Sequence, residues 1–247
     1  ALRQRNPNWK WEKDAPLCRV NNPRFNLRAA QFSILKTWGL VVDLSAAAKM
    51  GDELLTQGEF ANGEERIAEV PVPGDYFEAL RFNVPLIVKI KDPGEDVSPN
   101  VVLLQAAGEA VTVGDPIWGI KKFKAKDFIK RWGGATAILR DKFKLSTIRR
   151  GERSERVRTL QRFLQDFLRQ DSGRRSAGSS GKSVADAALK DFEVTGVFDV
   201  KTGQAIGQFQ EYYNLKRTEQ LDDLTVLLLN ARMMRGGPCL NPALDSR

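Results

Sequence analysis

The 247-residue sequence predicts an α+β domain followed by a small all-α domain. Between residues 85 and 140, short apolar or alternating runs are separated by Gly, Pro and Asp, which is typical of strands joined by turns. From residue 152 onward, the apolar residues recur at helical spacing. Because helical segments precede closely spaced strands, the sheet of the first domain is expected to be antiparallel. The expected divisions are an arm over residues 1–24, a first domain over 25–145, a second over 146–235 and a tail over 236–247.

The first domain opens with helical patterns. Residues 25–39 carry apolar side chains at helical spacing and end in a glycine, which predicts a helix that stops there. A second helix is expected over about 44–57 and a short one near 76–81, separated by a loop over 58–75 that contains Gly, Asn, Glu and Pro. The first 24 residues show no periodicity and are interpreted as an arm lying over the fold.

Four runs predict the strands of the sheet. They span residues 85–91, 101–106, 110–113 and 135–140. Each is short, apolar or alternating, and bounded by turn-forming residues. A short helix over residues 124–132 is expected between the last two strands.

Three helices are predicted in the second domain. The first covers residues 155–168 and the second covers 201–214, each with apolar residues on one face. The last begins at Asp222 or Asp223 and runs to about residue 234. Residues 169–183 are rich in Gly, Ser and Arg and are interpreted as a flexible insertion.

A short internal repeat precedes the last two helices. Residues 195–202 align with residues 218–225, and in both an apolar residue is followed by Asp and, three positions later, by Thr. An Asp at the start of a helix accepts hydrogen bonds from free backbone N–H groups. Helix capping therefore explains the spacing without a functional role.

The sequence contains no histidine and two cysteines. Histidine-dependent general-base catalysis is excluded, and two thiolates are too few for a structural zinc site. No metal site and no cofactor are expected.

The net charge of +8 is unevenly distributed. Residues 121–162 hold fifteen Lys and Arg against four Asp and Glu, a local charge of +11, whereas residues 51–100 are acidic. This basic band favours an anionic partner, unless it is simply a solvated face. Nucleic acid is not expected, because the band lacks a glycine–aromatic recognition motif and helix-turn-helix spacing.

Cys18 and Cys239 lie near opposite ends of the chain in loop-like contexts. Because domain termini often lie close together, a disulfide between them is expected in an oxidising compartment. The alternative is two unrelated, buried thiols.

Residues 154–229 resemble the small three-helix peptidoglycan-binding domains. The family pattern reads V..LQ..L, then G.FD..T..A...FQ, then D..T...L. The residues that carry it here are Val157, Leu160, Gln161, Gly196, Phe198, Asp199, Thr202, Ala205, Phe209, Gln210, Asp222, Thr225 and Leu228. The chain departs from the pattern in its long loop after the first helix and in Asp223, where a glycine is usual.

The resemblance implies a set of peptidoglycan contacts near this motif. These are Phe198, Asp199, Thr202, Gln210, Tyr212, Tyr213 and Arg217. The competing interpretation places Phe198, Phe209 and Tyr213 in the core and makes Asp199 and Thr202 caps. Gln210, Tyr212 and Arg217 are the better contact candidates, because they are expected to face outward.

The first domain resembles the papain-like cysteine peptidases of the bacteriocin-processing type. The turn Lys36-Thr-Trp-Gly39 fits the end of the family's nucleophile helix, which places Asn26 at the nucleophile position. Pro99-Asn100-Val-Val-Leu-Leu104 places Asn100 at the histidine position, and Val113-Gly-Asp115-Pro116 keeps the third member. Further along, Phe123, Phe128, Trp132 and Gly134 follow the family spacing.

The resemblance implies a peptidase fold without peptidase activity. An asparagine amide is not a nucleophile, and it cannot carry a proton as imidazole does. Asp115 alone has no imidazole to orient. We therefore expect no enzyme activity at Asn26, Asn100 and Asp115.

A degenerate peptidase domain followed by a peptidoglycan-binding domain resembles the periplasmic region of the general secretion pathway protein A family (ExeA type). The resemblance implies a periplasmic fragment of an inner-membrane-anchored protein, whose ATPase and membrane span lie outside this sequence. The partners it implies are peptidoglycan, the outer-membrane secretin and an inner-membrane secretion protein. Contact with a membrane is expected through the absent span alone, and association between copies of the chain stays open.

Three functions follow as alternatives. The leading one is a non-enzymatic module that binds the cell wall and helps the secretin pass or assemble through it. The second is a protein-interaction scaffold that holds a partner peptide in the old peptidase cleft. The third, a wall-remodelling hydrolase, is disfavoured because no acidic pair is placed for acid–base work.

Overall fold

The structure is a computed structural model of the chain. It describes residues 8–40, 43–44, 65–91, 97–176, 192–234 and 239–240. Almost all of the predicted helix over 44–57 and residues 177–183 of the predicted insertion lie outside these ranges. The chain divides into two compact units, one formed by residues 1–140 with 234–247 and the other by residues 141–233.

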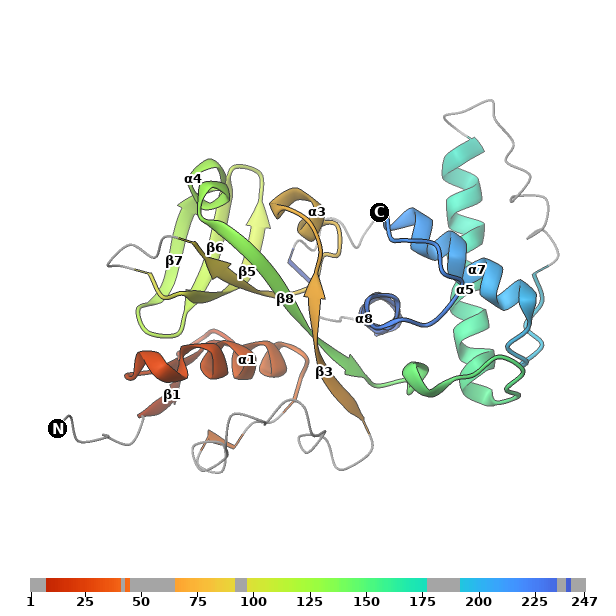
Figure 1. The fold of residues 1–247 in the computed structure, drawn as a ribbon, viewed down its shortest axis with the longest axis horizontal. Helices are drawn as coiled ribbons and strands as arrows, with labels where there is room; N and C mark the ends of the chain where they lie inside the picture. The colour runs from red at the N-terminus through yellow and green to blue at the C-terminus, as the bar shows by residue number, and fades with distance from the viewer. Residues whose placement is uncertain are drawn as a thin grey trace. The chain divides into compact units, whose positions relative to one another are not determined.

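The first unit is built on a six-stranded sheet (Figure 1). The strand order is β3-β8-β4-β5-β6-β7. The strands are β3 (Arg66–Val72), β4 (Leu86–Ile90), β5 (Asn100–Ala107), β6 (Ala110–Asp115), β7 (Gly119–Lys124) and β8 (Trp132–Asp141). β4 pairs antiparallel with β5 and β8, and β6 pairs antiparallel with β5 and β7. The α+β class with an antiparallel sheet is therefore confirmed.

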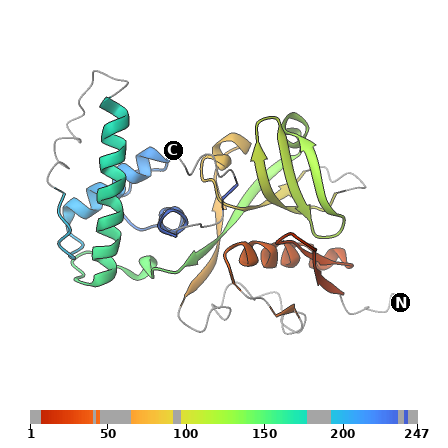
Figure 2. The ribbon, with the colours of Figure 1, turned by 180° about the vertical axis from the view of Figure 1, so that it is seen from behind.

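Helices lie at both ends of this sheet. The helix α1 (Asn26–Thr37) packs against β4 and β5 at one end, whereas α3 (Tyr76–Leu80) and α4 (Ala125–Lys130) lie at the other, as Figures 1 and 2 show. The short strands β1 (Trp9–Trp11) and β2 (Cys18–Val20) pair antiparallel, and a 3₁₀ turn, η1 (Pro23–Phe25), leads into α1.

The core of the first unit forms where α1 meets the sheet. Helical spacing places apolar side chains of α1 on one face, and alternation along the strands supplies the opposing surface. The largest fully buried side chains are Trp38, Phe32, Ile34, Leu35, Leu86, Leu103, Ile138 and Leu139. A second cluster near α4 stacks Tyr76, Phe128 and Trp132 edge to face.

Three helices form the second unit in the described part of the chain. They are α5 (Glu155–Ser176), α7 (Val200–Tyr212) and α8 (Asp223–Met233), preceded by a 3₁₀ turn, η2 (Leu145–Thr147). All three were predicted from apolar periodicity. Residues 169–176 continue α5 as a helix, so the predicted insertion is wrong over these residues.

Two strands of the sheet were missed, and both are edge strands. β3 lies where a loop was predicted, because Pro71 interrupts its alternation; an edge strand tolerates proline, since half of its N–H groups face outward. β7 is rich in lysine, which is a common feature of edge strands and hides the apolar signal. The predicted arm was also wrong in part, because residues 8–25 contain β1, β2 and η1.

Within the described ranges, no helix is long and apolar enough to cross a membrane. In the same ranges, no three His, Cys, Asp or Glu side chains come together in a way that could hold a metal ion.

Candidate functional site

The structure brings Asn26 and Asn100 into direct contact. Asn26 is the first residue of α1 and Asn100 the first of β5. The Asn26 Nδ2 donates to the Asn100 carbonyl oxygen at 2.8 Å, and its Oδ1 accepts from the Asn100 backbone N–H at 3.1 Å and from Nδ2 at 2.9 Å. The two positions that align with a peptidase nucleophile and its base therefore meet, although 74 residues separate them.

Asp115 lies at the end of β6 and is fully buried. Its carboxylate accepts from the Ser98 backbone N–H at 2.6 Å and from the Ser98 hydroxyl at 2.5 Å. It also accepts from the N–H groups of Ile117 and Trp118 at 2.8 and 3.0 Å. Asp115 thus fixes the β6–β7 turn and the segment leading into β5.

In this arrangement the polar side chains are engaged in hydrogen bonds that hold the ends of α1, β5 and β6 in place. The side-chain amides of Asn26 and Asn100 are hydrogen-bonded to each other. The buried Asp115 carboxylate accepts hydrogen bonds from four donors. Near these groups, Leu27 on α1 and Trp118 on the β6–β7 turn are exposed, Trp118 by 54%.

The two cysteines are not bonded to each other in the structure. Cys18 is fully buried on β2, where its backbone N–H donates to the Ser33 hydroxyl, and burial raises the pKa of its thiol to about 12. The predicted disulfide is wrong because Cys18 is held against α1, whereas the segment of Cys239 and Leu240 is bonded to Asn83 and Ala106.

A buried glutamine joins α5 to the loop before α7. The Gln161 Nε2 donates to the Val197 carbonyl at 2.9 Å and to the Thr202 hydroxyl at 2.8 Å, and its Oε1 accepts from the Gly196 N–H at 2.7 Å. The Asp199 carboxylate in turn caps α7 by accepting from the N–H and hydroxyl of Thr202. One side chain therefore fixes the loop, the cap and two helices.

The same arrangement recurs around Gln210, at the second copy of the sequence repeat. Its Nε2 donates to the Thr225 hydroxyl at 2.9 Å and the Gln220 carbonyl at 3.0 Å, and its Oε1 accepts from the Thr218 N–H at 2.8 Å. The Asp222 carboxylate caps α8 through Thr225, as Asp199 does for α7 through Thr202. The repeat in the sequence is thus a duplicated Gln–Asp–Thr bonding unit.

These contacts correct part of the predicted peptidoglycan site. Gln210 was expected to face outward and is fully buried. Asp199 and Thr202 act as the capping pair that was weighed as the alternative, and Phe198 is in the core. These four residues therefore have structural roles within the second unit.

The exposed part of the predicted site is aromatic and basic. Tyr212 is 41% exposed at the end of α7 and stacks edge to face on Phe167 and Tyr213. The half-buried Tyr213 hydroxyl accepts from the Arg232 Nε at 2.9 Å. Arg217 is exposed and bonds to Glu211 and Glu219, whose carboxylates raise the pKa of its guanidinium.

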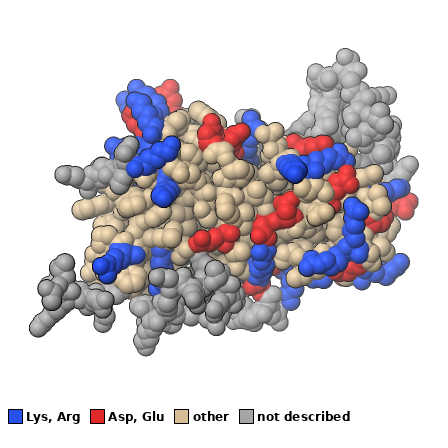
Figure 3. Space-filling view, in the orientation of Figure 1, with Lys and Arg blue, Asp and Glu red and all other residues tan. Residues whose placement is uncertain are grey.

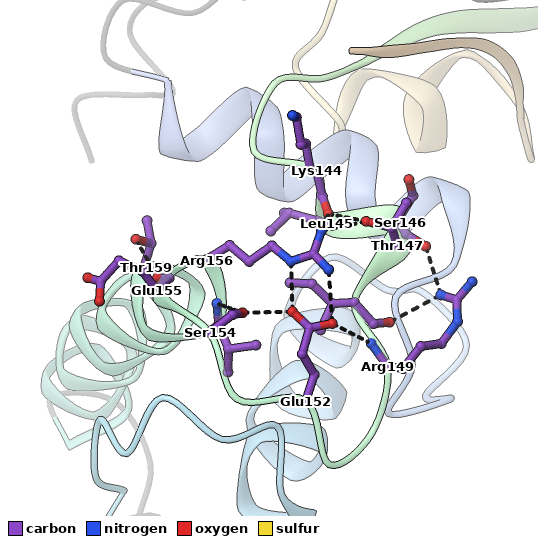
Figure 4. Close-up of polar contacts among 12 residues, drawn as sticks. Lys144, Leu145, Ser146, Thr147, Arg149, Glu152, Ser154, Glu155, Arg156 and Thr159 are labelled. Carbon is purple, nitrogen blue, oxygen red and sulfur yellow. Dashed lines mark hydrogen bonds and ion pairs between the residues drawn. The ribbon is translucent and has the colours of Figure 1, made fainter. Parts of the chain in front are cut away.

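A charged cluster fixes the segment that leads into α5 (Figure 4). Glu152 accepts two bonds from Arg156, at 2.7 and 2.9 Å, and one from the Ser154 hydroxyl at 2.7 Å. Arg156 also donates to Thr147 and the Lys144 carbonyl, which ties η2 to the start of α5. The bonds from Arg156 and Ser154 lower the pKa of the Glu152 carboxyl from 4.5 to about 2.

The low pKa of Glu152 predicts an acid-sensitive contribution to stability. A carboxyl whose pKa falls on folding stabilises the native state above its ordinary pKa, and this contribution is lost as the pH falls toward the folded value. We therefore expect Glu152→Gln to lower the melting temperature at pH 7, and the difference from the wild type to shrink between pH 4.5 and about 2. Glu155→Gln, at an exposed carboxylate, is the control and is expected to change little. A pH-independent difference would contradict the prediction.

The basic band over residues 121–162 is only partly available as exposed charge. It divides between the two units, and several of its arginines are used internally: Arg140 bonds to Glu65 and the Trp38 carbonyl, and Arg156 bonds to Glu152. In the first unit the exposed basic side chains gather over α4 and the end of β7 (Figure 3). Any anionic partner would therefore meet a local patch.

No family model matches the chain, and no curated protein matches it. Among solved structures, the chain is similar to a periplasmic domain of the EpsAB fusion protein of the Vibrio vulnificus type II secretion system. The match covers 89% of this chain and 82% of that chain, at 16% sequence identity and a TM-score of 0.46. The expected similarity to a periplasmic domain of a type II secretion protein is thus found. The chemistry of the sites depends on the residues of this chain.

Proposed function

We propose that this chain is a non-enzymatic, periplasmic module of a type II secretion system. In this proposal the second unit binds peptidoglycan and helps the outer-membrane secretin pass or assemble through the cell wall. The observation that carries the proposal is the duplicated Gln–Asp–Thr bonding unit around Gln161 and Gln210. It gives a structural role to the residues whose order and spacing resemble the peptidoglycan-binding pattern.

The exposed residues beside this scaffold suit a wall ligand. Glycan rings offer apolar faces that stack on aromatic side chains, and peptide stems carry carboxylates that pair with arginine. Tyr212 supplies an exposed ring, and Arg217 an exposed guanidinium. The proposed contact surface is therefore Tyr212 and Arg217, with Tyr213 as support.

Co-sedimentation with purified, insoluble peptidoglycan tests this proposal. We expect the full chain to pellet at low and at high salt, because specific contacts are screened less than a diffuse polycation. The double variant Tyr212→Ala/Arg217→Ala is expected to bind about tenfold more weakly. Lys216→Ala removes a neighbouring exposed charge and is the matched control.

Two outcomes would contradict wall binding. One is that the chain does not pellet, or is released entirely by modest salt. The other is that Lys216→Ala weakens pelleting as much as the double variant. Release of soluble muropeptides, abolished by a single carboxylate substitution, would instead favour a hydrolase.

A second candidate function rests on the first unit. In a papain-like interpretation, Asn26 and Asn100 occupy the nucleophile and base positions of a cleft, and Leu27 and Trp118, which lie close to Asn26 and Asp115 in the chain, are exposed. Such a cleft would hold a partner peptide without cleaving it. Trp118→Ala is then expected to weaken binding of the purified secretin periplasmic domain by about tenfold, while peptidoglycan pelleting is unchanged.

A further inference from the structure

A pocket of about 590 Å³ opens in the first unit, at the end of β5 that lies away from Asn100. It is formed by α3 and the residues after it, the β5–β6 turn, the junction of β7 with α4, and a residue close to the end of the chain. The lining residues are Tyr76, Phe77, Leu80, Asn83, Ala106, Gly108, Glu109, Lys124, Ala125, Lys126, Ile129 and Leu240. Asn26 and Asp115 do not line it, so it is separate from the degenerate peptidase site.

The lining combines an apolar floor with a basic rim. Phe77 is 63% exposed, although large aromatic side chains are buried on average. Lys124 and Lys126 are exposed beside it, against a single acidic residue, Glu109. The volume lies in the range of sites that take a small ligand or a short peptide segment.

A residue of the chain itself shows how a peptide is held here. Leu240 is 1% exposed in the wall of the pocket. Its backbone N–H donates to the Asn83 Oδ1 at 3.1 Å, and its carbonyl accepts from the Ala106 N–H at 3.5 Å. Leu240 is therefore held at the pocket edge by both of its backbone polar groups and by its buried aliphatic side chain.

We propose that this pocket binds an extended peptide segment of a partner protein. The segment lies beside Leu240, places an aliphatic side chain on Phe77 and carries acidic residues that face Lys124 and Lys126. Aliphatic burial supplies most of the affinity, and the charge pairing selects the sequence and orientation. The proposal is independent of wall binding, because it concerns the first unit and residues that the peptidoglycan proposal does not use.

Binding of labelled peptides to the full chain tests this site. The probes are fluorescein-labelled hexapeptides that combine one Leu with two Asp at each possible spacing, and the readout is fluorescence anisotropy. We expect at least one spacing to bind with a dissociation constant below about 1 mM. Replacing Leu by Ser in that peptide is expected to weaken binding by about tenfold.

Substitutions in the protein locate the site. Phe77→Ala and Lys124→Glu/Lys126→Glu are expected to weaken binding about tenfold or more, and both change exposed side chains. Lys122→Glu is the matched control, because Lys122 is exposed on the same strand as Lys124 but does not line the pocket. A version of the peptide with Lys in place of Asp is expected to bind the charge-reversed variant better than the wild type, which loss of folding cannot produce.

Three results would overturn the proposal. These are no binding by any of the acidic peptides, equal weakening by Lys122→Glu, and failure of the Lys-bearing peptide to prefer the charge-reversed variant. None of these three results bears on peptidoglycan binding, so either proposal can fail without the other.

Discussion

Gln210→Ala is expected to lower the free energy of unfolding of the second unit by about 3 kcal/mol. The substitution removes a fully buried amide and leaves the Thr225 hydroxyl, the Gln220 carbonyl and the Thr218 N–H without this partner. Because buried polar groups that lose a partner keep their desolvation cost, the effect exceeds that of one average hydrogen bond. Hydrogen exchange measured on the peptides of α7 and α8 reports the loss directly.

Gln204→Ala is the matched control for this prediction. Gln204 lies on the same helix and is half-buried, so its removal is expected to cost less than about 0.5 kcal/mol. Gln161→Ala, at the equivalent position on α5, is expected to resemble Gln210→Ala. If Gln204→Ala and Gln210→Ala cost the same, the duplicated bonding unit is not what holds the three helices in register.

The pair Asn26→Cys/Asn100→His is expected to create an ionised thiol. The two wild-type side chains are hydrogen-bonded at 2.9 Å, so a thiol and an imidazole placed there would lie within ion-pair reach. The thiol introduced by Asn26→Cys would also lie at the N-terminus of α1, which favours the thiolate. At pH 7 we expect about half or more of this thiol to be ionised, against a few per cent of an unassisted cysteine.

Thiolate absorbance at 240 nm measures this without requiring a reagent to reach a buried site. All variants carry Cys239→Ser, and Cys18 stays protonated because burial raises the pKa of its thiol to about 12. Asn26→Cys/Asn100→Gln is the control that keeps the hydrogen-bonding group and removes the imidazole. Equal absorbance in the two double variants at pH 7 would show that positions 26 and 100 do not have the geometry of a nucleophile and its base.

Sequence reasoning located most elements, and the two strands of the six-stranded sheet that it missed share one physical cause. The buried strands β4, β5, β6 and β8 have continuous or alternating apolar patterns, and each was found. The edge strands β3 and β7 were missed, because an edge strand has a single neighbour and tolerates proline or repeated lysine.

The predictions for the site residues also had different outcomes. The resemblance singled out Asn26 and Asn100, and the structure places these two residues in contact, although 74 residues separate them. It failed for Gln210, whose position after Phe209 at the end of a helix was interpreted as outward. A sequence does not distinguish a polar side chain that is buried in internal hydrogen bonds from one that is exposed to a ligand. Both are polar residues beside an apolar stripe.

The sequence alone determined the chemistry that this protein lacks and the helices and buried strands that it forms, because residue types and apolar periodicity are local properties. Because it contains no histidine, the sequence can form no thiolate–imidazole pair. Only the tertiary structure decided that Asn26 meets Asn100, that Gln161 and Gln210 are internal, and that Leu240 enters a pocket with Phe77 and Lys124. These are contacts between distant segments, and their partners are chosen by packing and hydrogen-bond geometry in three dimensions.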